Sequence, residues 1–132
     1  MKDYFIALLE WCKVKVLLWD KPTRVVFKEG EIWWCSIGMN AGEETFGKGP
    51  KLTRPVLIFK KFTKNSFLGL PLTGYEKEGS WYVPINMPSR KSSVMLNQAR
   101  IFDGVRLRKR ITSIGDIDFK TIKKKFKEFY CP

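Results

Sequence analysis

The stretch Arg54-Pro-Val-Leu-Ile-Phe-Lys60 is the segment of this sequence that decides the fold. A short apolar run with branched and aromatic residues, bounded by charged residues, predicts a β-strand. Similar runs lie around it in the chain, at residues 31–37, 66–73, 81–85 and 93–101. Proline within the runs 66–73 and 81–85 indicates an edge strand or a bulge. Short strands at close, turn-separated intervals predict a mainly β chain that folds as a compact barrel rather than a βαβ sheet.

The N-terminal segment predicts an amphipathic helix over residues 3–18, because apolar residues recur there at helical spacing. These residues are Phe5, Leu8, Leu9, Cys12 and Val16, and Pro22 follows as the expected end of the helix. The segment is too short and too charged to span a bilayer. We expect it to pack on the chain's own barrel, with a partner subunit or a membrane surface as alternatives. Residues 1–22 are thus predicted to form a helix and linker, and residues 23–132 the barrel domain.

The C-terminal segment Asp116 to Tyr130 predicts a second helix, which Asp116 can cap. Apolar residues repeat along one side of it, and lysines surround that side. The apolar residues are Phe119, Ile122, Phe126 and Phe129, and the lysines are Lys120, Lys123, Lys124, Lys125 and Lys127. Two interpretations of the lysines stay open: a solvated helix face, or contact with an RNA backbone.

Composition limits the size of the fold and the class of partner. The chain has 132 residues, enough for one domain with one core, and 44% of them are hydrophobic, so a packed interior is expected. The formal net charge is +12, which predicts a polyanionic partner. Nucleic acid is favoured over an anionic membrane surface or an acidic protein, and no membrane partner is predicted.

The absence of histidine excludes histidine acid–base pairs, Ser-His-Asp triads and every metal site that contains histidine. The cysteines, Cys12, Cys35 and Cys131, are odd in number and lack Cys-x-x-Cys spacing. Neither a disulfide framework nor a zinc site is therefore expected. We predict no metal, no cofactor and a reducing, cytoplasmic compartment.

Three motifs occur in a fixed order along the chain. The first is Gly30-Glu-Ile-Trp-Trp34 with Gly42-Glu-Glu44 beyond it, and the second is Arg54-Pro-Val-Leu-Ile58. The third is Gln98-Ala-Arg-Ile-Phe-Asp103, followed by Arg106-Leu107. Each motif alone is weak, but together, in this order and spacing, they resemble the MazF/PemK family of toxin–antitoxin ribonucleases over residues 30–130.

This resemblance implies an SH3-like barrel of the CcdB/MazF type with a C-terminal helix, usually as a homodimer. It also implies sequence-specific, metal-independent cleavage of single-stranded RNA or mRNA, which uses the RNA's own 2′-hydroxyl as the nucleophile. An acidic antitoxin protein would block the substrate groove. Fold alone does not decide function, because CcdB toxins use the same barrel to poison DNA gyrase without cutting RNA. A non-catalytic toxin or a simple RNA-binding protein therefore stays open as the alternative.

Candidate catalytic residues follow from what RNA cleavage requires. A guanidinium is permanently charged and forked, so it suits the phosphate in the transition state. Arg54 matches the family's arginine, and an ion pair between Arg54 and Glu44 is the structural alternative. Thr73 matches the family's strand-end threonine, whose hydroxyl can bond the phosphate or orient the 2′-hydroxyl. Glu44 is the candidate proton acceptor or reader of a base edge, in a loop from Gly38 to Thr53 that is too long for a hairpin turn.

Candidate binding residues come from the loop, the strands and the basic segments. Asn97 and Gln98 can read bases with their amides, and Trp33 and Lys48 are further substrate-binding candidates. One branch of the family has an arginine and an acid where this chain has Met95 and Asn97. We therefore expect catalysis to depend mainly on Arg54 and Thr73. The aromatic residues that could stack on bases are Trp33, Trp34, Tyr75, Trp81 and Tyr82. The residues that could hold phosphates are Lys60, Lys61, Lys64, Arg90, Lys91, Arg106, Arg108, Lys109 and Arg110.

Overall fold

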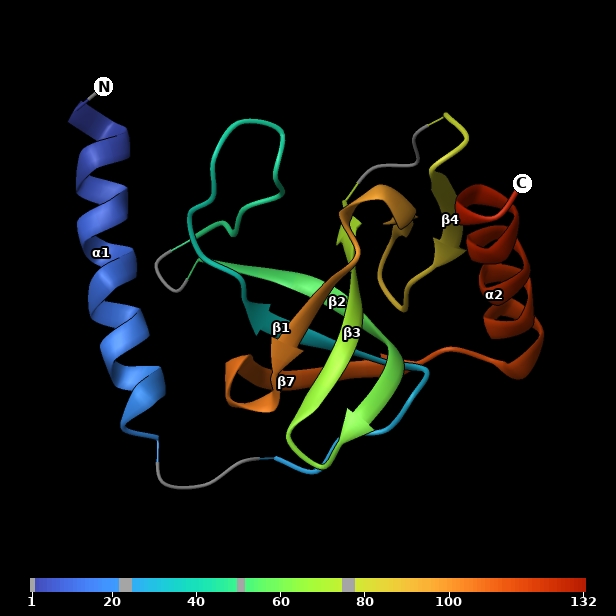
Figure 1. Cartoon of the computed structure of the whole chain (residues 1–132), viewed down its shortest axis with the longest axis horizontal. Coiled ribbons are helices and arrows are strands. Elements are labelled where there is room, and N and C mark those ends of the chain that lie inside the picture. Colours follow the sequence, from blue (N-terminus) through green and yellow to red (C-terminus); the bar gives the residue numbers. More distant parts are fainter. Residues whose placement is uncertain (1, 22–24, 50–51, 75–77) are drawn as a thin grey trace.

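The computed structural model describes residues 2–21, 25–49, 52–74 and 78–132. Within them, seven antiparallel strands form one curled sheet, with a helix at each end of the chain (Figure 1). The helices are α1 (Lys2–Trp19) and α2 (Asp116–Tyr130). The strands are β1 (Glu31–Ser36), β2 (Thr53–Thr63), β3 (Ser66–Thr73), β4 (Tyr82–Asn86), β5 (Lys91–Met95), β6 (Arg100–Asp103) and β7 (Leu107–Ser113).

The long strand β3 makes the sheet curl. It pairs with β2 along one side, and on its other side with β6 at its beginning and with β5 at its end. The strand order is β4-β5-β3-β2-β1-β7, with β6 beside β3. Strands β6 and β7 lie at opposite edges and are joined by a short 3₁₀ turn, Gly104–Arg106. The chain therefore wraps round into a partly open barrel, which confirms the predicted mainly β class with terminal helices.

Apolar residues of β2 alternate between two cores. Val56 and Ile58 are fully buried inside the barrel, whereas Leu57 faces the opposite side of the sheet. On that side α2 covers the sheet with Ile122, and Phe126 stacks on Phe59 with ring centroids 4.5 Å apart. The predicted bounds and apolar side of α2 are thus confirmed. Its predicted cap is wrong: Gly115 is the N-cap residue and makes no side-chain bond, while Asp116 lies in the first turn.

The predicted strand over residues 93–101 is wrong, because the chain turns a corner there. Strand β5 ends at Met95, a 3₁₀ turn spans Leu96–Gln98, and β6 begins at Arg100. Val94 pairs with Leu72 and Arg100 with Gly69, so six residues of the chain advance along only three of β3, which a single straight strand could not do. Strand β7 was not expected, since its Arg108, Lys109 and Arg110 conceal any alternation of apolar and polar residues.

Helix α1 forms as predicted but contacts the barrel with a different face. The residues expected to pack, Phe5, Leu8, Leu9, Cys12 and Val16, are all exposed. Trp11 and Leu18 are buried instead and pack with Leu52. The helix is apolar on more than one side, so periodicity could not select the docking face. Pro22 and the predicted domain boundary after it lie outside the described residues. Among the described helices, none is long and apolar enough to cross a membrane.

Glu31 begins β1 as a buried carboxylate, 7% exposed, with three hydrogen-bond donors. Its Oε1 accepts from the backbone N–H of Lys28 at 2.7 Å and from Trp33 Nε1 at 3.1 Å. Its Oε2 accepts from Arg110 Nη1 at 3.2 Å. Burial alone would raise the pKa of Glu31, but these bonds outweigh burial and hold the pKa below its ordinary value.

We expect Glu31→Ala to lower the free energy of unfolding by about 1–3 kcal/mol, because buried donors lose their acceptor. Since the pKa of Glu31 is lowered in the folded state, its contribution is present above the unfolded pKa and is lost as the pH falls through the folded pKa. Urea unfolding at pH 7 and at pH 3 measures both effects. Arg110→Ala is the control, and its cost should be small because that side chain is 58% exposed. Equal costs for the two variants would contradict the assignment.

Candidate functional site

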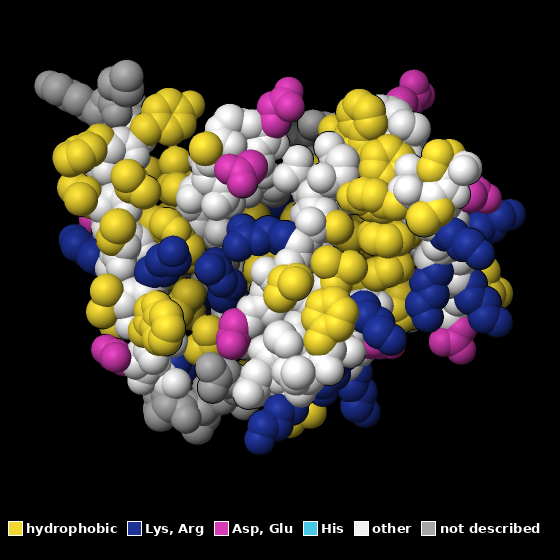
Figure 2. Space-filling model, viewed as in Figure 1, with side chains coloured by type: hydrophobic (Ala, Val, Ile, Leu, Met, Phe, Trp, Pro, Cys, Tyr) yellow, Lys and Arg dark blue, Asp and Glu magenta, His cyan; other side chains and the backbone are white. Residues whose placement is uncertain are grey.

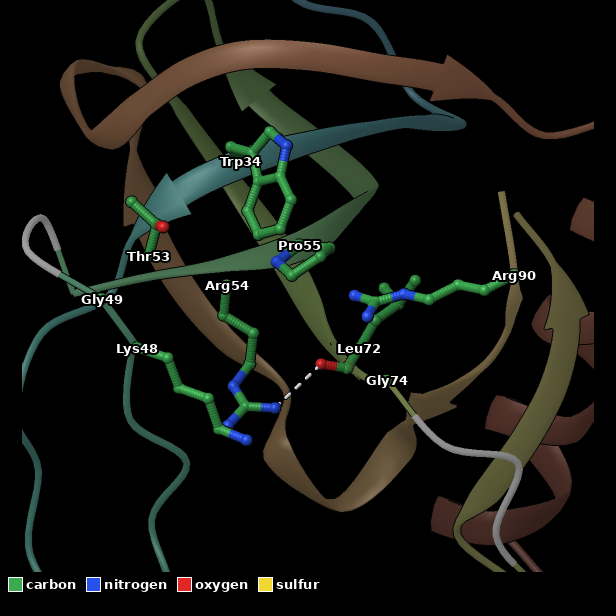
Figure 3. A pocket seen from close by; sticks show the side chains of 9 residues that line it. All are labelled: Trp34, Lys48, Gly49, Thr53, Arg54, Pro55, Leu72, Gly74 and Arg90. Carbon is green, nitrogen blue, oxygen red and sulfur yellow. Dashed lines mark hydrogen bonds between the residues drawn. The ribbon is translucent and has the colours of Figure 1, made fainter. Parts of the chain in front are cut away.

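A cavity of about 400 Å³ opens where the loop before β2 meets the end of β3 (Figure 3). Strand β1 contributes Trp34 to its wall, β2 contributes Arg54, and the turn between β4 and β5 contributes Arg90. The complete lining is Trp34, Lys48, Gly49, Thr53, Arg54, Pro55, Leu72, Gly74 and Arg90. Three of these side chains are cations and none is a carboxylate, so the cavity suits an anion.

The guanidinium of Arg54 is held in place by the backbone. Its Nε donates to the carbonyl of Phe46 at 2.9 Å, and its Nη1 donates to the carbonyl of Leu72 at 3.1 Å. Burial lowers the pKa of Arg54, but an arginine remains charged at neutral pH. Among the described residues Arg54 makes no ion pair, so the suggested pairing with Glu44 is not found. The group is therefore positioned, half-buried and not neutralised by a carboxylate.

Arg90 reaches into the same cavity from the opposite side (Figure 3). Its guanidinium lies against Gly74, where a Cβ atom would be 3.2 Å from Nη1. The hairpin that carries it is closed by a bond of 2.8 Å from the N–H of Met87 to the Arg90 carbonyl. Glycine at position 74 therefore lets a second guanidinium approach the end of β3.

Thr73 ends β3 and is buried, with 7% of its surface exposed. Val56 of β2 pairs with Pro71 of β3, and continuing this register by two residues puts Arg54 opposite Thr73. Directly opposed residues carry their side chains on the same face of a sheet. Thr73 itself is not among the residues that line the cavity beside Arg54, although its neighbours Leu72 and Gly74 are.

The two tryptophans of β1 point to opposite faces of the strand, as successive strand residues do. Trp34 lines the cavity, with its ring over Pro55 (Figure 3). Trp33, the residue expected to bind substrate, is buried in the barrel core and donates its indole N–H to Glu31. The structure therefore corrects the expectation for Trp33: Trp34 is the tryptophan that a ligand can reach.

Glu44, Asn97 and Gln98 come together beside a second cavity of about 450 Å³, apart from Arg54. Gln98 holds the loop, since its Oε1 accepts from the N–H of Thr45 at 2.9 Å and its Nε2 donates to the carbonyl of Glu43 at 3.0 Å. Glu44 closes a local turn by accepting from the N–H of Ala41 at 3.0 Å. Asn97 is exposed. The predicted site residues thus form two groups. Arg54 and Lys48 line the first cavity, and Glu44, Asn97 and Gln98 line the second.

Leu52 anchors the loop before β2 to the rest of the fold. Its backbone has φ 50°, a left-handed conformation that is rare for a bulky residue. Its carbonyl accepts from the N–H of Ile37 at 3.2 Å and from that of Gly38 at 3.1 Å. Its side chain packs with Trp11 of α1, which in turn lies where a Cβ on Gly38 would be, 2.0 Å away. Helix α1 therefore supports the base of the loop that carries Lys48.

Several of the predicted phosphate-binding cations have structural partners. Lys61 donates to the carbonyl of Phe27, and Arg106 to that of Ser36. Arg108 donates to the hydroxyl of Ser36. Figure 2 shows lysines and arginines gathered over α2 as well, where the lysines are exposed. Tyr75, one of the predicted stacking residues, lies outside the described residues. The number of positive charges therefore could not identify Arg90 as a site residue. Only its position in the cavity distinguishes it from the other cations.

Residues 28–130 match the family described as PemK-like, MazF-like toxin of type II toxin-antitoxin system. The chain belongs to this family. The match covers the sheet and α2 and excludes α1. A comparison with curated proteins finds no match by sequence.

The chain also superposes on solved structures of MazF proteins. MazF from Deinococcus radiodurans superposes with a TM-score of 0.64 at 16% identity, over 80% of this chain and 97% of that one. An endoribonuclease in complex with its cognate antitoxin from a mycobacterial species gives 0.63 at 12% identity, over 81% and 98%. Mycobacterium tuberculosis toxin MazF-mt6 gives 0.59 at 14% identity, over 76% and 95%. At these identities the superpositions establish the MazF fold.

Proposed function

We propose that this MazF-like toxin is a metal-independent, sequence-specific endoribonuclease that cuts single-stranded RNA in the cavity beside Arg54. The observation that carries the proposal is the state of Arg54: two backbone carbonyls orient its guanidinium, and no carboxylate of the described residues neutralises it. An arginine placed this way has no structural ion pair to make. It is available to the negative charge that develops on a phosphate in the transition state.

The reaction needs only the RNA's own nucleophile. The 2′-oxygen attacks the adjacent phosphorus and releases its proton to water, while the bond from phosphorus to the 5′-oxygen breaks and that oxygen takes up a proton. Arg54 and Arg90 stabilise the charge on the non-bridging oxygens from two sides of the cavity. The Thr73 hydroxyl donates to the phosphate or orients the 2′-hydroxyl, and Trp34 stacks on a neighbouring base.

The second cavity supplies sequence recognition. We assign Glu44 to reading a base edge rather than to proton transfer, because it lines this cavity and not the one beside Arg54. Asn97 is exposed on the same wall, and Gln98 keeps the loop in position. Lys48 binds a flanking phosphate. One strand of RNA thus runs from the first cavity to the second.

An acidic antitoxin protein occupies the same cationic groove and blocks it. Solved relatives support this assignment: one structure is named MazE-MazF from Deinococcus radiodurans, and another is an endoribonuclease with its cognate antitoxin. We assign the chain to the cytoplasm, in line with its free cysteines Cys12, Cys35 and Cys131. We propose a homodimer, as the resemblance to the family implies.

The test is cleavage of a mixed-sequence RNA in the presence of EDTA, with mapping of both new ends. We expect discrete cuts that leave a 2′,3′-cyclic phosphate and a 5′-hydroxyl. Random cuts with a 3′-hydroxyl would indicate a contaminating or metal-dependent nuclease. Intact RNA at high protein concentration would contradict the proposal, and inhibition of DNA gyrase by the same preparation would favour the non-catalytic alternative.

A further inference from the structure

Helix α1 has a second apolar face that the fold leaves uncovered. Its first face, with Trp11 and Leu18, is buried against the barrel. Large apolar side chains elsewhere on the helix are nevertheless exposed: Phe5 is 63% exposed, Val16 59% and Trp19 86%. In Figure 2 many hydrophobic side chains are visible on α1, at the left edge of the molecule, with a few charged ones among them. Soluble monomers rarely expose a continuous apolar patch without a partner.

Tyr4, Ile6, Leu8 and Leu17 of α1 are exposed as well, but five of the exposed residues are spaced like the seam of a coiled coil. Phe5, Leu9, Cys12, Val16 and Trp19 follow one another at intervals of four, three, four and three residues. This is the heptad repeat, in which positions a and d face a second helix. At 100° per residue the seam lies roughly 120° around the helix axis from Trp11. Phe5, Leu9, Cys12 and Val16 therefore lie apart from the face that contacts the barrel, whereas Trp19, at the end of the seam, also lines a small cavity with Val105 and Arg106.

We propose that α1 pairs with α1 of a second copy of this chain, as a parallel and in-register helix pair. Charges beside the seam favour this partner and this direction. Lys15 and Asp20 occupy the positions that meet across a parallel interface, so Lys15 of each copy faces Asp20 of the other. An antiparallel pair centred on Cys12 would instead bring the two Lys13 side chains together.

Net charge favours a second copy over an anionic membrane. Residues 1–21 contain four lysines and three acidic residues, although the whole chain carries +12. Lys13 is already paired with Glu10, with Nζ 3.2 Å from Oε1. A membrane-surface helix is typically rich in Lys and Arg along its polar face, and α1 is nearly neutral. Two copies of α1 can therefore approach with little of the repulsion that separates two basic barrels.

The barrel removes the usual obstacle to a short helix pair. An isolated helix of 18 residues is marginal in water, because forming its first turn is costly. Here Trp11 and Leu18 already hold α1 against the barrel, and Lys21 donates to the carbonyls of Val105 and Leu107. Pairing therefore brings together two helices that are already formed. Figure 1 shows α1 at one side of the molecule, beside the barrel, so a second helix can approach it from outside.

Cysteine cross-linking tests the proposal directly, because Cys12 lies in the seam. Helices packed at about 8–10 Å bring facing seam residues within the Cα distance that a disulfide needs. Cys35 does not interfere, since burial raises the pKa of its thiol to about 12. In a Cys131→Ser chain, diamide should therefore oxidise the two Cys12 thiols to one disulfide and join two chains in a covalent dimer on a non-reducing denaturing gel. Cys12→Ser in that background should abolish the dimer.

A second pair of variants gives the direction and excludes random collision. In a Cys12→Ser, Cys131→Ser chain, Val16→Cys should cross-link, since a parallel pair places residue 16 opposite itself. The matched control is Leu17→Cys, which is 68% exposed but lies off the seam, and it should remain monomeric under the same oxidation. Cross-linking is independent of RNA cleavage. The difference between positions 16 and 17 tests the helix pair, because any dimer formed by the barrels is present in both variants.

Two substitutions on the seam complete the experiment. Leu9→Lys with Val16→Lys should abolish cross-linking through Cys12, with the circular dichroism of the folded chain retained. Equal cross-linking of Val16→Cys and Leu17→Cys would overturn the proposal. So would flotation of the wild-type chain with phosphatidylserine vesicles in place of cross-linking, which would assign the face to a membrane.

Discussion

Arg54→Ala is expected to slow RNA cleavage by about 100- to 1000-fold, the usual cost of removing one donor that stabilises transition-state charge. The guanidinium is the group that the backbone holds in the cavity, through the carbonyls of Phe46 and Leu72. Single-turnover cleavage of a short RNA in EDTA measures the effect. Arg54→Lys should recover little of the rate, because an ammonium on a flexible stem cannot keep both carbonyl bonds and a forked contact to phosphate.

The control for Arg54 removes one positive charge from elsewhere on the surface. Lys109 on β7 is exposed and lies outside both cavities, so Lys109→Ala should change the rate little and mainly weaken binding at low salt. Arg54→Ala should also unfold at nearly the wild-type denaturant concentration, since its side chain is only half-buried. Cleavage by Arg54→Ala at the wild-type rate would place the chemistry in another part of the molecule.

Gly47→Ala is expected to lower cleavage by about 100-fold although residue 47 touches no substrate, because a displacement of about 1 Å at the reacting groups costs this much. A Cβ atom on Gly47 would be 1.7 Å from the carbonyl oxygen of Leu52, which is backbone and cannot move aside. The loop must therefore open. Opening it displaces the Phe46 carbonyl that orients Arg54 and breaks the bridge between Lys48 and Thr53.

The matched control for Gly47 is Gly115→Ala. Gly115 has an ordinary φ of −68°, and a Cβ atom there meets nothing within 4 Å. That variant should cleave RNA like the wild type. Single-turnover rates and thermal unfolding of both variants separate loss of geometry from loss of folding. A Gly47→Ala chain that is fully active would show that the loop can shift without moving Arg54, and would contradict the role given to the Phe46 carbonyl.

The regular elements could be predicted where one face of the element is clearly apolar. Helix α2 has the bounds that the sequence indicated, because its single apolar face repeats with the period of a helix. Strand β3 also has its predicted bounds, because it is a short apolar run that begins and ends at polar residues. Strand β7 was missed because three basic residues dominate it, and the break at Leu96–Gln98 was missed because only the pairing of β5 and β6 with β3 requires it. Those pairings join residues that are far apart in the chain.

Only part of the candidate site could be predicted, because the rest depends on contacts between residues that are far apart in the chain. Arg54 and Lys48 could be chosen from motif and loop, and they share one cavity. Trp33 and Trp34 are adjacent and chemically identical, so only the side of β1 that faces the core decides between them. In the sequence Arg90 is one of many cations, and only the structure shows that its guanidinium lies against Gly74.

The sequence by itself determined the mainly β class, the two helices, the basic character and the family, because these depend on local periodicity, composition and short motifs. The tertiary structure alone decided that Arg54 has no carboxylate partner among the described residues and that Glu44, Asn97 and Gln98 lie beside a separate cavity. It also decided which face of α1 is buried and which is free to pair. The physical reason is that hydrogen bonds and packing contacts connect residues that are distant in the chain, and a local sequence pattern contains no information about such contacts.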